Sequence, residues 1–404
     1  MEQYLSKKKI NEKKWILEFV PKDLSFLIEN KKIEYKQKNL KCAYLTHLLN
    51  YMICKYYHTD KKEVSLSSEV LRKWYGTYYN YYLDFLIDND ILIKDKSYFV
   101  GMKCNTYLLN SRYYDKGINI FTRYKNDNSF ILKKWKEKQL EFEIQSLNDT
   151  RIINPWVKKR LIDDLYHVEI DFNGASKCLL EMYKNGKLDS DKSYLKNLLS
   201  IESIQDGTLF YVEDDFGRLH TNFTVLKKVL RNEYVRIDGD EVCELDIPNS
   251  QPTFLSILLK ERGFDKQYPL EYSYYKSCVK DGIIYDMLAS ELNISRDDAK
   301  KKLFYILFGR NIWNSNCDKA FKKLFPEVFQ WMVVEKDVMK DHRTIAHQLQ
   351  KKESRLVFDN IIYRLKNEIP DIKLFTVHDS ILFPKKYHSQ VSEIFYNQVD
   401  SLFG

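Results

Sequence analysis

Apolar residues recur along this chain mostly at helical spacing, and short alternating stretches interrupt that pattern in a few places. The clearest helix is predicted between Ser295 and Gly309, because serine caps helix starts and glycine is common just after helix ends. One stripe of this helix carries, at every fourth position, Arg296, Lys300, Phe304 and Phe308. A buried stripe is apolar throughout, whereas this one begins with two cations and finishes with two aromatic rings.

The stripe has two interpretations. The commoner one is an amphipathic helix with one solvated end. In the other, the cations bind a triphosphate while the rings pack on a base and sugar. Arg296 lies in the first turn, where the helix dipole disfavours a cation unless an anion is nearby. This position favours the second interpretation, which depends on the rest of the chain.

The region from about Leu40 to Asn110 forms the first coherent unit. The stretches KCAYLTHLLNYMICKYY, VSLSSEVLRKWYG and YYNYYLDFLIDNDILI predict three helices, and KSYFV and TYLLN predict a hairpin of two short strands. This order resembles a winged helix, a module that binds DNA or proteins or simply packs. The following region, to about Leu198, is mixed, helical and rich in lysine.

After Gly207 the pattern becomes strand-like. TLFYVEDDFGRLHTNF predicts a hairpin that turns at Asp214-Asp215, and EYVRIDGDEVCELDI predicts another with a strong Asp-Gly turn signal. From Gln251 onward helices dominate until KLFTVHDSILF, which predicts one further strand-like run.

Two acids, Asp246 and Asp379, stand at the ends of strand-like apolar runs. An isolated acid at such a place is usually a turn former. If the two strands lie side by side, however, the carboxylates converge and repel each other unless a divalent cation lies between them. Hard oxygen ligands favour magnesium, and two such ions can support an in-line phosphoryl transfer.

Three motifs in order resemble motifs A, B and C of the single-subunit polymerases, which include family A DNA polymerases and phage-type RNA polymerases. They are the strand ending at Asp246, the helix pattern R-x3-K-x7-aromatic-G from Arg296, and the strand-His-Asp pattern at Asp379. GRLHTNFTVLKKVLR is similar to the family A segment that contacts the primer–template. IAHQLQKKESRLVFDNII resembles, more weakly, the helix before motif C.

The resemblance implies a role for each matching residue. Asp246 and Asp379 would hold two magnesium ions, and Lys300 would neutralise or protonate the leaving pyrophosphate. The nucleotide site would comprise Arg296, Lys300, Phe304, Phe308 and Gln251, with Gln251 near the sugar. The primer–template site would comprise Arg218, Thr221, Gln350 and His378.

The implied architecture is an α+β right-hand fold with palm, fingers and thumb, joined to a winged-helix-like domain. The predicted segments are an N-terminal domain at 1–112, a thumb-like region at 113–206, the first part of the palm at 207–252, fingers at 253–347 and the second part of the palm at 348–404. The resemblance covers about half the chain, from Gly207 onward. No stretch ahead of the thumb has the carboxylate cluster of a proofreading exonuclease.

Composition adds little to this hypothesis. The net charge of +8 is a mild indication of a polyanionic partner. Seven scattered cysteines predict reduced thiols and a cytoplasmic setting, and no apolar run approaches the length of a membrane span. The expected partners are primer–template DNA and dNTPs, with other replication proteins at the N-terminal domain and no membrane.

The motifs also depart from the family pattern. Gln251 stands where family A DNA polymerases carry a glutamate, Phe308 replaces a customary tyrosine, and His378-Asp379-Ser380 is closer to the RNA-polymerase branch. Three hypotheses follow. The first is a family A DNA polymerase of the kind that phages and plasmids encode, and the second is a primase or RNA polymerase of the same fold. The third is a non-catalytic replication protein that binds DNA.

Overall fold

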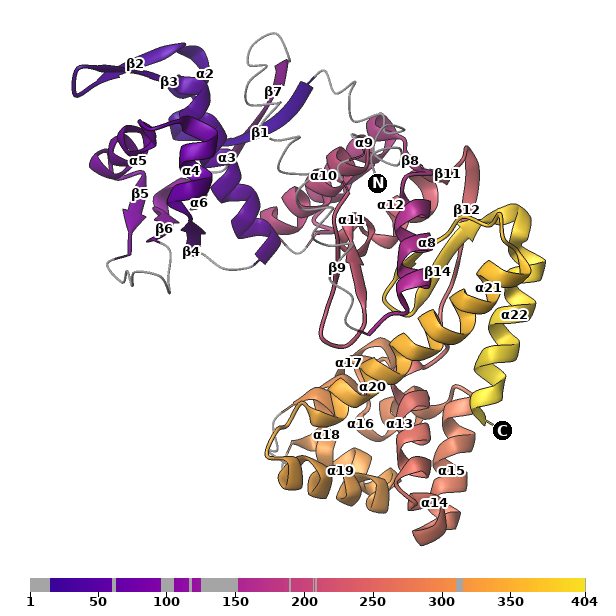
Figure 1. The fold of residues 1–404 in the computed structure, drawn as a ribbon. Coiled ribbons are helices and arrows are strands. Elements are labelled where there is room, and N and C mark those ends of the chain that lie inside the picture. Colours follow the sequence, from indigo (N-terminus) through magenta and orange to yellow (C-terminus); the bar gives the residue numbers. More distant parts are fainter. Residues whose placement is uncertain are drawn as a thin grey trace. The chain divides into compact units, whose positions relative to one another are not determined.

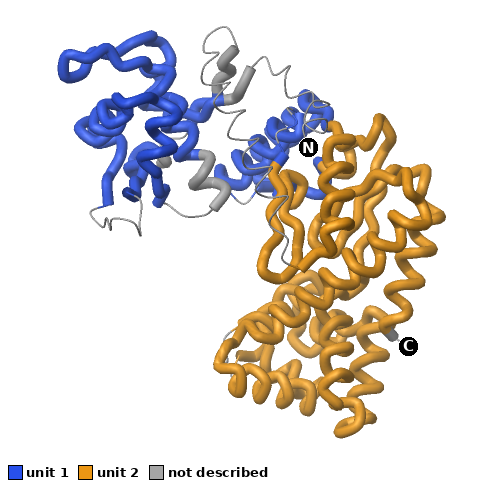
Figure 2. The backbone as a smooth tube through the Cα atoms, viewed as in Figure 1, with its two compact units in different colours: residues 1–145, 170–209, 225–230 blue, residues 146–169, 210–224, 231–404 orange. Residues whose placement is uncertain are grey.

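The computed structural model of the chain divides into two compact units (Figure 2). Unit 1 comprises residues 1–145, 170–209 and 225–230, and unit 2 comprises residues 146–169, 210–224 and 231–404. The structure describes residues 15–59, 63–95, 105–115, 118–124, 152–188, 190–205, 207, 209–309 and 315–403.

Unit 1 combines helices with small sheets (Figure 1). Its elements are β1 (Trp15–Pro21), η2 (Lys22–Leu24), α2 (Phe26–Glu29), β2 (Lys32–Tyr35), β3 (Lys38–Lys41), α3 (Cys42–Thr59), β4 (Glu63–Leu66), α4 (Ser68–Tyr75), α5 (Tyr79–Asp88), β5 (Leu92–Lys94), β6 (Asn105–Leu109), α6 (Arg112–Asp115), β7 (Ile118–Tyr124), α9 (Phe172–Lys184) and α10 (Asp191–Gln205). Strands β1 and β7 pair, β2 and β3 pair, and a three-stranded sheet has the order β4-β6-β5.

Helix α3 is the central helix of the N-terminal part of unit 1. It buries Leu45, Leu48, Leu49 and Met52, which follow the i, i+3, i+4, i+7 spacing of a single helix face. Helix α4 is capped by Ser67, whose hydroxyl accepts a hydrogen bond from the amide of Glu69. The three helices predicted for this region are therefore confirmed.

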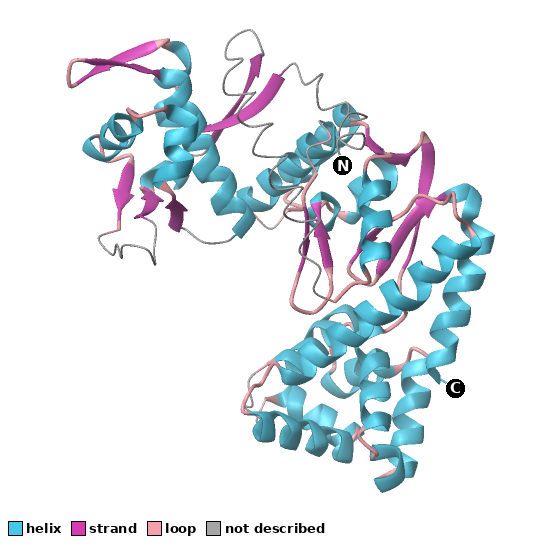
Figure 3. Ribbon diagram, viewed as in Figure 1, coloured by secondary structure: helices cyan, strands magenta, loops and turns pink. Residues whose placement is uncertain are grey.

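Unit 2 is built around a five-stranded sheet of order β13-β14-β12-β11-β8, next to which helices α13 to α19 gather (Figure 3). Its elements are α8 (Pro155–Leu165), β8 (Val168–Ile170), β9 (Tyr211–Glu213), β10 (Leu219–Thr221), α11 (Asn222–Val225), α12 (Lys228–Tyr234), β11 (Val235–Ile237), β12 (Asp240–Leu245), α13 (Ser250–Glu261), α14 (Phe264–Gln267), α15 (Pro269–Lys280), α16 (Ile284–Leu292), α17 (Arg296–Phe308), α18 (Asn316–Leu324), α19 (Pro326–Met339), α20 (Thr344–Arg355), η3 (Leu356–Ile362), α21 (Tyr363–Glu368), β13 (Phe375–Val377), β14 (Ser380–Pro384), η4 (Lys385–Tyr387), α22 (His388–Asp400) and η5 (Ser401–Phe403). Strands β13, β14, β12 and β11 pair antiparallel in that order.

Helices α20 and α21 are joined without a break by the π-helical segment η3. A π-helix is rare, and single π turns occur frequently at functional sites. The segment buries Val357, Phe358 and Ile361, so its distorted backbone lies in the core of unit 2.

The predicted mixture of helices and sheets is confirmed, and so are several local elements. The helix after Ser295 ends before Gly309, and the hairpins at Asp214 and at Asp238-Gly239 form as expected. KLFTVHDSILF differs from the prediction, because it contains two strands with His378-Asp379 as the turn between them. The expected strand KSYFV and residues 125–151 of the predicted thumb-like region lie outside the described residues.

The two units do not follow the five predicted segments. Residues 170–209, most of which belong to the predicted thumb-like region, group with the N-terminal part of the chain, while residues 231–404 stay together. The right-hand architecture and its segment boundaries therefore remain predictions. Within the described ranges, no helix is both long enough and apolar enough to cross a membrane.

Candidate active site

Asp246 and Asp379 meet at one end of the unit 2 sheet. Asp246 directly follows β12, whose last residue, Leu245, pairs with Ile381 of β14. Asp379 directly precedes β14, in the two-residue turn from β13. Because β12 and β14 are adjacent and antiparallel, the end of one strand meets the start of the other. Two acids from distant parts of the sequence thus come together.

The carboxyl group of Asp379 is held where ionisation is unfavourable. Burial and the negative charges of Glu353 and Asp246 together raise its pKa to about 6, although its own backbone amide and Arg218 lower it. Asp246 itself is exposed. A divalent cation between the two aspartates would relieve this repulsion, and carboxylate oxygens are the ligands that magnesium prefers. The donor chemistry fits magnesium, although no group of three or more His, Cys, Asp or Glu side chains in the described ranges is arranged to hold a metal ion.

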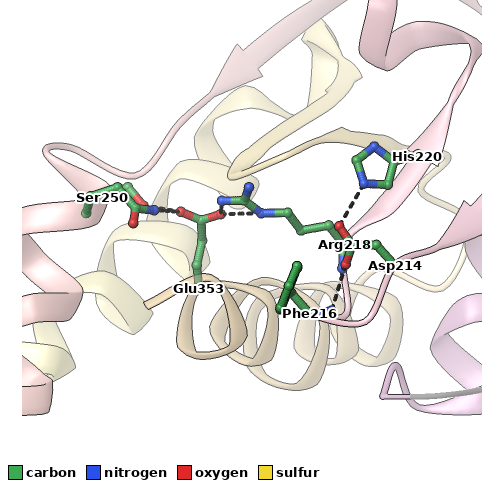
Figure 4. Close-up of polar contacts among 7 residues, drawn as sticks. Asp214, Phe216, Arg218, His220, Ser250 and Glu353 are labelled. Carbon is green, nitrogen blue, oxygen red and sulfur yellow. Dashed lines mark hydrogen bonds and ion pairs between the residues drawn. The ribbon is translucent and has the colours of Figure 1, made fainter. Parts of the chain in front are cut away.

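Glu353 of α20 is the centre of the polar contacts beside these acids (Figure 4). Its Oε1 accepts hydrogen bonds from Nε of Arg218, at 3.1 Å, and from Nη2 of the same guanidinium. Its Oε2 accepts from the hydroxyl of Ser250 at 2.5 Å and from Nε2 of Gln251 at 2.6 Å. The side chain is 2% exposed. One buried carboxylate therefore connects Arg218 with the start of α13.

Glu353 was not among the residues predicted from the sequence, which on this helix were limited to Gln350, one turn earlier, as a primer–template contact. Gln350 is half-buried and has no hydrogen bond within the described residues. The sequence signal for Glu353 is its place on the apolar stripe that includes Leu349 and Leu356, where an apolar residue is expected. A buried acid on such a stripe needs partners, and Glu353 has three.

Arg218 is positioned by the turn between β9 and β10. The carboxylate of Asp214 accepts hydrogen bonds from the amides of Phe216, at 2.9 Å, and Arg218, at 3.0 Å. Burial alone would raise the pKa of Asp214, but hydrogen bonds from His220 and from these amides outweigh it and lower the pKa. Gly217 has a φ of 81°, and an added Cβ would lie 3.0 Å from Ile152, so the turn requires glycine.

His378 occupies the same turn as Asp379, with a left-handed φ of 57°. Its ring meets His220 edge to face, with the centroids 6.0 Å apart. Desolvation of the ring and the positive charge of Arg218 lower the pKa of its imidazole to about 4. A neutral His378 therefore lies beside the Arg218 guanidinium at neutral pH.

Thr221 is not part of this cluster. It is 1% exposed, and its hydroxyl accepts a hydrogen bond from the amide of Phe223 at 3.2 Å. Its own amide donates to the hydroxyl of Thr224 at 2.6 Å. These contacts form the start of α11, so in this structure Thr221 has a local structural role rather than an exposed binding surface.

Helix α17 begins as the sequence predicts, with the hydroxyl of Ser295 accepting a hydrogen bond from the amide of Asp298 at 3.1 Å. The anion that Arg296 needs in the first turn is Asp286, 3.2 Å away. The same guanidinium lies over the ring of Tyr285, 5.4 Å from its centroid. Burial raises the pKa of Tyr285 to about 12, while the charge of Arg296 lowers it and that of Asp379 raises it. Tyr285 thus lies within electrostatic reach of both residues.

The remaining residues of the α17 stripe are exposed or half-buried. Lys300 is exposed and has no ion pair within the described ranges, and Phe304 and Phe308 are half-buried. The two rings are stacked, with their centroids 5.4 Å apart and their planes 13° from parallel. The stripe therefore presents a cation and two parallel rings along one helix face.

The carboxyl end of α17 is held by Lys336 of α19. The Lys336 ammonium donates hydrogen bonds to the carbonyl oxygens of Ile306, at 2.8 Å, and Gly309, at 3.2 Å. Burial lowers its pKa to about 8. A cation at a helix carboxyl end is favourable, so this contact fixes the orientation of the helix.

The chain matches no model of a protein family and no curated protein. The function of the chain is therefore inferred from its residues and from their arrangement.

Proposed function

We propose that unit 2 carries the active site of a template-dependent nucleotidyltransferase, a DNA-directed DNA polymerase of the single-subunit family A type that lacks a proofreading exonuclease. The observation that supports this most strongly is the meeting of Asp246 and Asp379 at adjacent strand ends. A turn-forming role for each acid would not require this proximity, which raises the pKa of Asp379. Bound cations would offset the repulsion between the two carboxylates, and this accounts for the presence of both.

In this proposal Asp246 and Asp379 hold two magnesium ions. When bound, the ions would activate the primer 3′-hydroxyl and stabilise the departing pyrophosphate. Lys300, exposed and without an ion pair in the described ranges, approaches the phosphates as a cation and a proton donor. Arg296 exchanges Asp286 for the triphosphate, because both are anions that its guanidinium binds in the same way.

The stacked rings of Phe304 and Phe308 offer an apolar surface for the incoming base. Arg218 reaches the primer end by leaving Glu353, and His378 braces that end. Two further parts of the proposal concern architecture. The sheet of unit 2 is the palm and helices α13 to α19 are the fingers. The N-terminal order α3-β4-α4-α5-β5-β6, with sheet order β4-β6-β5, is that of a winged helix.

One observation supports RNA synthesis as the second candidate. Gln251 is buried, and its Oε1 has no hydrogen-bond partner within the described residues. That oxygen could accept a bond from a ribose 2′-hydroxyl. Nε2 of Gln251 is, however, bound by Glu353, which holds the side chain in place. A fixed side chain discriminates by shape, so we place dNTPs first.

The test is extension of a labelled primer on a DNA template with magnesium, using dNTPs and NTPs in separate reactions. Asp246→Asn and Asp379→Asn should each abolish extension while duplex affinity changes little, because affinity comes from many phosphate contacts. Asp371→Asn is the matched control, since Asp371 is exposed and lies outside the three motifs. Near-normal extension by either motif variant would refute the proposal.

A further inference from the structure

The hairpin of β2 and β3 in unit 1 concentrates positive charge. Between positions 31 and 41 the chain has five lysines and one acid, Glu34. All five are exposed, namely Lys31, Lys32, Lys36, Lys38 and Lys41. Only Lys36 has an ion pair within the described residues, with Asp88 of α5 at 2.9 Å. Most of this charge therefore has no counter-charge in the described protein.

Two of these lysines face each other across the ladder. Lys32 and Lys41 are direct partners in the antiparallel register of β2 and β3. Like charges directly opposite destabilise a strand pair, and a two-stranded hairpin is only marginally stable by itself. Lys31, exposed beside them, adds to the repulsion. An anion bound across Lys32 and Lys41 would remove this cost.

The turn of the hairpin is held in a strained conformation. Lys36 and Gln37 have φ values of 48° and 60°, the left-handed region that two-residue hairpin turns normally fill with asparagine and glycine. Asp88 anchors this turn to α5, because it pairs with Lys36 and accepts a hydrogen bond from the hydroxyl of Tyr35. The hairpin therefore presents its lysines from a fixed geometry, and Figure 1 shows it as a ribbon extending beside the helices.

The neighbouring helix is unsuited to the same partner. In a helix-turn-helix arrangement the second helix usually enters the major groove, and here that helix would be α5. Its exposed residues include Asp84 and Asp88, which repel phosphate. A two-stranded β-ribbon also fits the major groove of a duplex. Tyr78, which is 59% exposed with Lys38 over its ring, adds a flat contact surface beside the ribbon.

We propose that the β2–β3 hairpin binds the phosphate backbone of duplex DNA through Lys32 and Lys41. This contact is independent of the proposed active site, which lies in unit 2. The protein would hold duplex through unit 1 whether or not unit 2 extends a primer. Failure of either proposal therefore leaves the other standing.

The test uses full-length protein and a labelled DNA duplex closed by a loop at each end, which offers no 3′ terminus to the active site. Binding is measured by fluorescence anisotropy over a series of salt concentrations. Lys32→Ala combined with Lys41→Ala should weaken binding by at least about tenfold and reduce the slope of log affinity against log salt by about 2. The control is Lys266→Ala combined with Lys280→Ala, which removes the same charge from exposed positions in unit 2.

A second variant separates binding from folding. Lys32→Glu places opposite charges across the ladder, so it should maintain or raise the melting temperature while it weakens duplex binding. Unchanged affinity in both hairpin variants would overturn the proposal. So would a loss confined to single-stranded DNA or to anionic lipid vesicles, or a fall in melting temperature with Lys32→Glu.

Discussion

Arg218 and Glu353 form an ion pair that ties the β9–β10 hairpin to helix α20 within unit 2. The guanidinium is 18% exposed and the carboxylate 2% exposed, and Nε of Arg218 lies 3.1 Å from Oε1 of Glu353. The other carboxylate oxygen binds Ser250 and Gln251, the residues that open α13. This pair therefore sets the relative positions of three segments around Asp379.

Removing the carboxylate should destabilise unit 2. Glu353→Ala should lower the free energy of unfolding by about 3 kcal/mol, because breaking a buried ion pair leaves its partner without compensation. Glu353→Gln, which keeps the shape, should cost less. Urea denaturation provides the measurement. Lys352→Ala is the neighbouring control, since its pair with Glu261 lies near the surface and should contribute at most about 1 kcal/mol. Equal losses in Glu353→Ala and Lys352→Ala would contradict the central role of Glu353.

Asp379 should make stability depend on pH. Its folded pKa, about 6, is above the ordinary value, so its contribution is fully present below pH 4 and is lost as the pH rises through 6. Asp379→Asn remains neutral and should stabilise the protein at pH 8 by about 1–2 kcal/mol after solvent screening, with little gain near pH 4. Denaturation in EDTA at both pH values measures this gain. A gain that is the same at both would exclude Asp379 as its source.

Lys300 should act in turnover rather than in folding. Lys300→Ala should reduce the rate of nucleotide addition by roughly a hundredfold, the scale of one lost transition-state charge or proton donor. The next residue provides the control, because Lys301 is also exposed and pairs with Asp298 at 3.0 Å. Single-turnover extension distinguishes the two variants. Similar rates for Lys300→Ala and Lys301→Ala would mean that this face of α17 does not meet the phosphates.

Gln251 should decide the choice of sugar. A pocket that discriminates by shape alone should favour dNTPs over NTPs by about a hundredfold. Gln251→Ala removes the bulk held by Glu353 and should erode this preference, chiefly by improving NTP use. Incorporation of a single nucleotide with each sugar measures it. If wild-type protein incorporated NTPs with the same efficiency as dNTPs, the acceptor oxygen of Gln251 would outweigh its bulk. The RNA-synthesis candidate would then take precedence.

Local chemistry was enough to predict several elements. The stripe and cap of α17 and the hairpins that turn at Asp214 and at Asp238-Gly239 follow from periodicity and turn residues. These signals act between near neighbours in the chain, so they predict local structure correctly without knowledge of the fold. The assignment of the motifs to a polymerase stays a prediction of the sequence.

Only the tertiary structure decided how the distant residues meet. It split KLFTVHDSILF at His378-Asp379, made Glu353 the partner of Arg218, and supplied Asp286 to Arg296. None of these outcomes has a local signature strong enough to specify it. Each depends on which segments pack together, because a charged side chain pairs with whichever partner that packing brings within hydrogen-bonding distance.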